Sequence, residues 1–228
     1  MRVSDRELVV LSIIVFALGV ILWSIMRTKT ISRIEKPSTT CKLSDVRTGD
    51  LLLFNTMYSF NTDVLKIVLQ TQYVHAGVAF RDRIGQLWVF EVYPDGNGCQ
   101  VNLMRKRILD GNELCYVRHI NKPIDRRVME KTVLKLLGKR YSYNFVPLVL
   151  NAWLRKFMVT PMLKHMGRYH ERLCSELVAD VYSMLGVMDF ENSTVPAGMM
   201  QPSDYCDGAP HPLPFMNEYK FGKEQLIT

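Results

Sequence analysis

Three side chains far apart in the chain are of the types that perform covalent catalysis: His75, Glu91 and Cys174. Cys174 lies at the start of residues 173–185, whose apolar spacing predicts a helix ended by Gly186. A thiol in the first turn of a helix has its pKa lowered by the helix dipole, and N–H groups there are free to bind an oxyanion. A histidine could take the thiol proton and a glutamate could orient the imidazole, so the set could cleave an amide or ester through an acyl-enzyme.

Two of these residues, Cys174 and His75, also have an ordinary structural interpretation. A free cysteine is most often a small buried hydrophobic residue. A lone histidine on a strand is more often a hydrogen-bonded core residue than a base. Residue type and spacing alone leave both interpretations open.

A predicted β-hairpin carries His75 and Glu91. Its strands are residues 74–80 and 87–93, and the short connection between them places Gly85 at the position of a three-residue loop that favours a left-handed conformation. With this loop, the numbers of directly opposed residues sum to 168. The turn therefore predicts the register of the whole hairpin.

This register divides the hairpin into two faces. The even-numbered residues form one apolar face, and the odd-numbered residues, including His75 and Glu91, form the other. His75 and Glu91 become diagonal neighbours within reach of a hydrogen bond. Gly77 and Ala79 leave the odd-numbered face low enough for a helix to pack on it.

A series of motifs in this chain resembles, in order, the permuted papain-like fold of the NlpC-type superfamily. The match is to its bacterial permuted amidase and peptidase branch, which has relatives in large DNA viruses. The motifs are GDLLLF at 49–54, VHAGVAF at 74–80, FEV at 90–92, GKRYSY at 138–143, LCSELV at 173–178 and QPSD at 201–204. The resemblance covers about residues 45–205, and the histidine precedes the cysteine as that branch requires.

The resemblance implies a role for each candidate residue. Cys174 would be the nucleophile, His75 the base and Glu91 the orienting third member. No metal and no cofactor are implied, and the substrate would be a peptide, an amide or an acyl compound. A related acyltransferase branch continues its cysteine with Glu-His, whereas this chain has Ser175 and Glu176.

Residues 145–168 form an insertion that departs from the family pattern. They mix large apolar residues with basic ones, and Pro147 and Pro161 break the segment. Either the insertion is a core helix followed by a loop, or it lies with its apolar side on a membrane surface.

Residues 8–26 contain 19 consecutive uncharged residues, which as a helix span roughly 28 Å, close to the thickness of a bilayer core. This length, and the absence of a small-residue cleavage site, favour an uncleaved membrane anchor over a signal peptide. The predicted organisation is a short tail at 1–7, the anchor at 8–26, a basic tether at 27–44 and a thiol hydrolase domain at 45–228.

The distribution of charge and cysteine predicts the orientation of this anchor. Basic residues are concentrated after the apolar run, which places the domain on the cytosolic side by the positive-inside rule. Five cysteines, an odd number without a C-x-x-C motif, are typical of reduced thiols. The glycosylation triplet at residues 192–194 argues weakly for the opposite side.

The charge distribution and the absence of certain motifs argue against other classes of protein. The net charge of +7 is uneven: residues 126–172 hold eleven basic and two acidic residues, whereas residues 173–228 hold two and eight. Nucleic acid is therefore not an expected partner, and the lipid bilayer is. Serine-hydrolase and Walker motifs are absent. Residues 105–107, Arg-Lys-Arg, are predicted to be a solvated loop.

The pattern of predicted elements gives an α+β domain, with an antiparallel sheet packed on helices. Strands are predicted at 50–55, 74–80, 87–93, 100–103 and 114–119, and helices at 63–70, 125–137 and 173–185, with a Pro-interrupted apolar stretch at 145–166. The predicted function is a membrane-anchored cysteine hydrolase of amidase or peptidase type. Two alternatives remain: a catalytically silent binding or virion-structural protein, and a lipid acyltransferase or thioesterase.

Overall fold

The computed structural model describes residues 17–19, 21, 39–56, 66, 71–93, 98–110, 113–139, 174–209 and 211–228. The chain divides into two units, Met1–Glu35 and Lys36–Thr228. In the first unit residues 17–19 and 21 are helical, and the rest of the predicted anchor lies outside the described residues. Within the described ranges, no helix has the length and apolar character needed to cross a bilayer.

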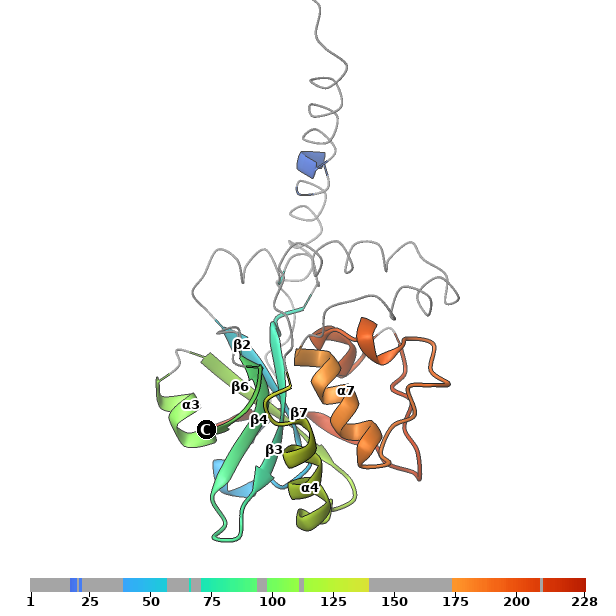
Figure 1. The fold of residues 1–228 in the computed structure, drawn as a ribbon. Helices are drawn as coiled ribbons and strands as arrows, with labels where there is room; N and C mark the ends of the chain where they lie inside the picture. Colours follow the sequence, from blue (N-terminus) through green and yellow to red (C-terminus); the bar gives the residue numbers. More distant parts are fainter. Residues whose placement is uncertain are drawn as a thin grey trace, which may run out of the picture. The chain divides into compact units, whose positions relative to one another are not determined.

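The second unit is built on one seven-stranded sheet (Figure 1), which confirms the α+β class. The strand order is β1-β7-β6-β2-β3-β4-β5. In chain order the strands are β1 (Thr40–Cys41), β2 (Leu51–Thr56), β3 (His75–Arg81), β4 (Leu87–Tyr93), β5 (Gly98–Leu103), β6 (Glu113–Ile120) and β7 (Phe221–Ile227). The five predicted strands are β2 to β6, each within about two residues of its predicted ends.

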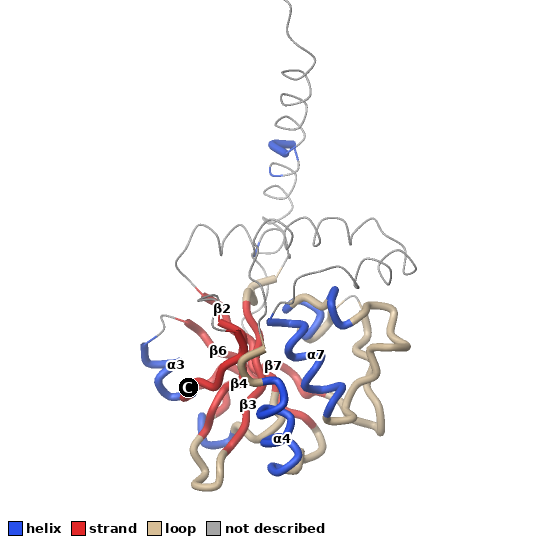
Figure 2. The backbone as a smooth tube through the Cα atoms, viewed as in Figure 1, coloured by secondary structure: helices blue, strands red, loops and turns tan. Residues whose placement is uncertain are grey.

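The described helices lie on both sides of the sheet (Figure 2). The α-helices are α3 (Met104–Asp110), α4 (Arg126–Leu136) and α7 (Cys174–Met184), and short 3-10 turns are formed by η1 (Leu43–Asp45), η2 (Ala197–Met199) and η3 (Pro202–Tyr205). Helix α4 begins where predicted, because the Asp125 carboxylate accepts hydrogen bonds from the N–H groups of Arg127 and Val128. The predicted helices at 63–70 and 145–166 lie outside the described residues, apart from the helical Lys66.

The register of the β3–β4 hairpin is the predicted one. Val78 pairs with Phe90, and Phe80 pairs with Trp88, so the numbers of opposed residues sum to 168. Gly85 at the tip has a φ of 81°, the left-handed conformation that the three-residue loop requires.

The two faces of this hairpin belong to two separate cores. The even-numbered face packs with α4 and α7, in a cluster that includes Val78, Phe90 and Val178. The odd-numbered face packs under α3, in a second cluster to which Val89 and Met104 contribute. A helix therefore does cover the odd-numbered face, but it is α3, which the sequence did not predict.

Three expectations need correction. Residues 105–107 are part of helix α3 and not a loop, because Met104 and Ile108 on the same helix pack on the sheet. The sheet is mixed and not purely antiparallel, since β1 pairs with β7 in parallel. Residues 40–45 of the predicted tether belong to the folded unit as β1 and η1.

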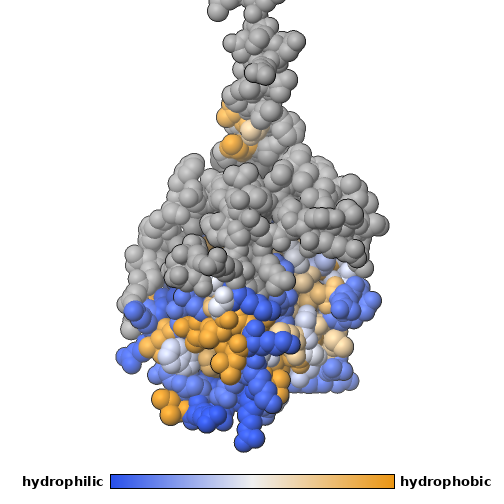
Figure 3. Space-filling model, in the orientation of Figure 1, coloured by the Kyte–Doolittle hydropathy of each residue, from blue (hydrophilic) through white to orange (hydrophobic). Residues whose placement is uncertain are grey.

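The surface on the side shown in Figure 3 is mainly hydrophilic, with apolar residues coming to the surface in places. The large exposed apolar side chains of the second unit include Leu134 and Leu137 at α4, and Ile84, which is 89% exposed. Ile84 lies in the tip of the β3–β4 hairpin, so that tip contributes no core contact.

Candidate active site

His75 and Glu91 meet at the sheet end of the hairpin. The Nε2 atom of His75 lies 2.7 Å from Oε2 of Glu91, and the Glu91 side chain is completely buried. Gly77 provides the room for this contact, because a Cβ at Gly77 would lie 2.7 Å from Cγ2 of Val89 and 3.3 Å from Cβ of Glu91. The predicted hydrogen bond between the diagonal neighbours is present.

Cys174 is the first residue of α7, as predicted, and is partly exposed. Burial raises the pKa of its thiol, but the charge of His75, a hydrogen bond with His75 and hydrogen bonds from the N–H groups of Ala76 and Ser175 lower it below its ordinary value. The structure thus brings all three candidate residues together, since His75 contacts both Cys174 and Glu91.

The charge state of His75 follows from the same contacts. Burial lowers the pKa of the imidazole, but the negative charge of Cys174 and hydrogen bonds with Cys174 and Glu91 raise it to about 10. Glu91 engages Nε2, which leaves Nδ1 as the nitrogen for Cys174. A thiolate beside an imidazolium is the arrangement that activates cysteine nucleophiles at neutral pH.

The first turn of α7 is held in place by the segment after it. The Ser175 hydroxyl donates to the carbonyl of Met200, and the Tyr205 hydroxyl donates to the carbonyl of Ser175 over 2.8 Å. Residues 201–204, the QPSD motif, form the turn that carries these groups: the Asp204 carboxylate accepts from the N–H of Gln201 over 2.7 Å. The motif therefore fixes the position of the residue next to Cys174.

Two further residues bind Glu91 and were not identified from the sequence. The side-chain amide of Asn102 donates to Oε1 of Glu91 over 2.8 Å, and Nε of Arg107 lies 3.2 Å from the same oxygen. Burial raises the pKa of Glu91, but His75, Arg107 and Asn102 together lower it below its ordinary value. Asn102 pairs with Val89, which places it on the face that carries Glu91, but the sequence predicted only its strand and not this register.

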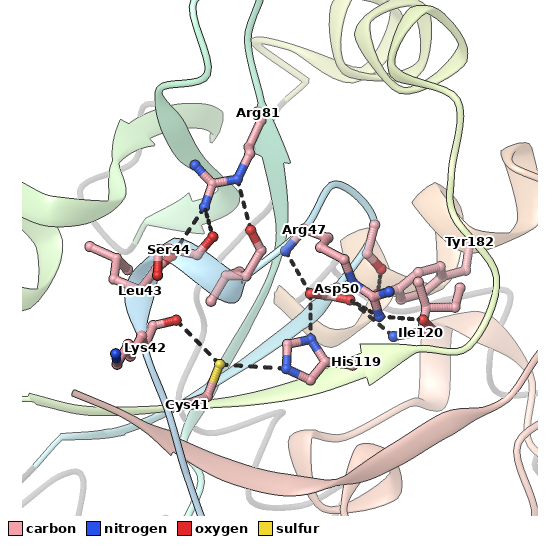
Figure 4. Close-up of polar contacts among 12 residues, drawn as sticks. Cys41, Lys42, Leu43, Ser44, Arg47, Asp50, Arg81, His119, Ile120 and Tyr182 are labelled. Carbon is pink, nitrogen blue, oxygen red and sulfur yellow. Dashed lines mark hydrogen bonds and ion pairs between the residues drawn. The ribbon is translucent and has the colours of Figure 1, made fainter.

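A second cysteine–histidine–carboxylate array lies at the opposite end of β2 (Figure 4). His119 joins the two other members, with Nε2 3.5 Å from Sγ of Cys41 and Nδ1 2.7 Å from Oδ2 of Asp50. Cys41 is 5% exposed, and burial together with the charges of Asp45 and Asp50 raises its pKa. The array has the connectivity of a thiol triad, but the pKa of its cysteine is raised, whereas that of Cys174 is lowered.

Asp50 explains the start of the GDLLLF motif. Its buried carboxylate accepts from the N–H groups of Arg47, over 2.7 Å, and Ile120, over 3.0 Å (Figure 4). Buried N–H groups without an acceptor are costly, so this carboxylate joins the turn before β2 to the end of β6. The motif thus has a structural role away from Cys174.

The pH dependence of alkylation should separate Cys174 from an ordinary thiol. Below its pKa, a thiol with the ordinary value of 9.0 reacts about tenfold faster for each added pH unit. We expect the iodoacetamide rate of Cys174 to level off at a lower pH than that of an ordinary thiol, because its pKa is lowered while that of His75 is raised to about 10. Peptide mass spectrometry from pH 6 to 9 measures this, and a tenfold rise per unit at Cys174 would contradict it.

Cys206 provides the internal comparison for that experiment. It is partly exposed like Cys174, but burial and the charge of Glu224 raise its pKa to about 12. Its alkylation should therefore rise steadily over the same pH range.

Comparison with known proteins adds a distant structural resemblance. No protein family matches the sequence, and neither does any curated protein. The structure is similar to that of the metalloprotein YiiX from Escherichia coli O157:H7, with 19% identity and a TM-score of 0.43, over 63% of this chain and 70% of that chain. In the described parts of this chain, no group of three or more His, Cys, Asp or Glu side chains is placed to hold a metal ion.

Proposed function

We propose that the second unit is a cysteine hydrolase that cleaves an amide or ester bond through an acyl-enzyme on Cys174. The observation that carries the proposal is the continuous contact from Cys174 to His75 to Glu91, at the first turn of α7. The sequence resemblance to the permuted papain-like hydrolases supports the same roles for the same three residues.

In the first half of the reaction, the thiolate of Cys174 attacks the substrate carbonyl carbon and forms a carbon–sulfur bond. The carbonyl oxygen becomes an oxyanion, for which the N–H groups at the start of α7 are available donors. The imidazolium of His75 then donates its proton to the leaving amine or alcohol, and the carbon–nitrogen or carbon–oxygen bond breaks. The products are a thioester on Cys174 and the free leaving group.

In the second half, His75 acts as a base. It takes a proton from water as the water oxygen attacks the thioester carbonyl, and the carbon–sulfur bond breaks to release the acid and restore the thiolate. Glu91 keeps the imidazole in one orientation throughout and stabilises its protonated form, as the third member of such triads does.

We further propose that residues 8–26 anchor this hydrolase in a membrane with the second unit facing the cytosol. The support is the length of the uncharged run and the basic residues that follow it. An anchored enzyme would act on substrates at or near the bilayer surface, which includes both peptides and acylated lipids.

Selective labelling of Cys174 tests the hydrolase proposal. We expect an electrophilic thiol probe at pH 7 to label Cys174 at least tenfold faster than Cys206. The thiolate is the reactive form, and the pKa of Cys174 is lowered whereas that of Cys206 is raised. Labelling of Cys174 no faster than Cys206 would leave a binding protein as the better interpretation.

The substrate class is tested by trapping the intermediate. Incubation with peptide esters and with acyl lipids, followed by acid quench and intact-mass measurement, should show a mass increase on Cys174 for one class. A Cys174→Ser variant provides the control, since an increase that persists in it comes from another residue. A fatty-acyl mass would indicate a lipid thioesterase or acyltransferase, and a peptidyl mass a peptidase.

A further inference from the structure

We propose that Arg107 is a positioning residue of this site: through its ion pair with Glu91, helix α3 keeps the Glu91 carboxylate ionised and directed at His75. The inference rests on the proposed function, because it assigns a residue to the control of the Cys174 nucleophile. Arg107 lies in a segment whose sequence suggested a solvated loop.

The first support is the charge balance around Glu91. Its side chain is completely buried, and a buried carboxylate without a compensating cation is strongly unfavourable. His75 contributes one positive charge, but that charge faces two anions, Glu91 and the Cys174 thiolate. Among the described partners of Glu91, Arg107 carries the other positive charge, and a guanidinium does not lose it at accessible pH.

The second support is how Arg107 is fixed. Its side chain is only 11% exposed, and Nη1 forms an ion pair with Glu113 on β6. Its guanidinium carbon lies 5.0 Å from the centre of the Phe54 ring, which in turn lies 5.4 Å from the centre of the His75 ring. Arg107 therefore touches both the carboxylate that orients His75 and the ring that packs against it.

The contrast within α3 shows that this position is specific. Arg105 and Lys106 on the same short helix are exposed, whereas Arg107 is directed into the site. The basic run is thus not a uniform solvated cluster. One member is part of the buried charge network, and its neighbours are available as controls.

The direction of the effect follows from the titratable groups that face Glu91 and Arg107 within the described part of the chain. These are His75 on β3, which also contacts Cys174 on α7, and Glu113 and Cys115 on β6. Cys115 stays neutral because burial raises its pKa well above the ordinary value. Loss of Arg107 removes a positive charge from a site that holds several anions. Both Glu91 and the Cys174 thiolate then become harder to ionise.

The test is the pH profile of Cys174 alkylation in the full chain. In Arg107→Gln we expect the midpoint of the acid limb to move up by about one pH unit, with a roughly tenfold lower rate at pH values well below the wild-type midpoint. In Glu113→Gln, which removes a negative charge, we expect the midpoint to move down. Arg105→Met, a change at an exposed arginine of the same helix, should leave the profile unchanged.

Opposite shifts in two variants distinguish an electrostatic role from damage to the fold, because unfolding would not move one midpoint up and the other down. Coincident midpoints in wild type, Arg107→Gln and Glu113→Gln would overturn the inference. If Arg107→Gln does not fold, the Glu113→Gln shift decides alone. Failure of the proposed function is a separate result, in which wild-type Cys174 itself reacts no faster than Cys206.

Discussion

Replacement of His75 by alanine is expected to lower the alkylation rate of Cys174 at pH 7 by roughly 10- to 100-fold. The substitution removes both the charge and the hydrogen bond that lower the pKa of the thiol, while its burial, which raises the pKa, remains. A thiol with a pKa near 9.0 is only about 1% ionised at pH 7. The smaller figure allows for the greater intrinsic nucleophilicity of a less acidic thiolate.

His119→Ala is the matched control for this experiment. His119 is also a strand histidine that binds a buried carboxylate and lies beside a cysteine, but its partners are Asp50 and Cys41. The His119→Ala substitution should leave the reactivity of Cys174 unchanged. An equal loss of Cys174 reactivity in both variants would mean that general destabilisation, and not the local charge of His75, controls the thiol.

Gly49→Ala is expected to destabilise the fold by about 3 kcal/mol. Gly49 has a φ of 89°, which a residue with a Cβ rarely adopts, and a Cβ there would lie 2.4 Å from Cγ1 of Ile124. The backbone strain and the steric clash add, and the next residue is the Asp50 that joins this turn to β6. Chemical denaturation measures the change in the free energy of unfolding.

Gly85→Ala separates the two contributions to that loss. Gly85 has a similar φ of 81°, but nothing lies within 4 Å of the position of its Cβ. Gly85→Ala should therefore lower the free energy of unfolding by only about 1 kcal/mol, the contribution of backbone strain alone. Equal losses at the two glycines would show that the contact with Ile124 relaxes without cost.

The parts of the site that could be predicted are those fixed by local geometry. The turn at Gly85 determined the hairpin register, and strand alternation then placed His75 beside Glu91. Helical periodicity placed Cys174 at a helix start. That this helix end meets the hairpin at His75 was implied by the family resemblance and not by the spacing.

The parts that could not be predicted depend on distant chain segments. The position of Arg107 over Glu91 requires α3 to fold back across β4 after the end of β5, and a basic tripeptide carries no signal of that path. Strand β7 contains several polar residues and β1 has only two residues, so neither has a recognisable strand pattern. Both are stabilised by pairing that the local sequence does not encode.

The exposed tip of the β3–β4 hairpin has a consequence for how this sequence can vary. Most surface loops accept insertions and deletions, and Ile84 is so exposed that almost any side chain would be accommodated there. Yet a one-residue slip in the pairing of β4 against β3 would turn Glu91 to the opposite face, away from His75, and the three-residue loop at Gly85 is what sets this register. Natural variants that keep His75 beside Glu91 are therefore free to change the side chain at position 84 but are expected to keep the glycine at position 85.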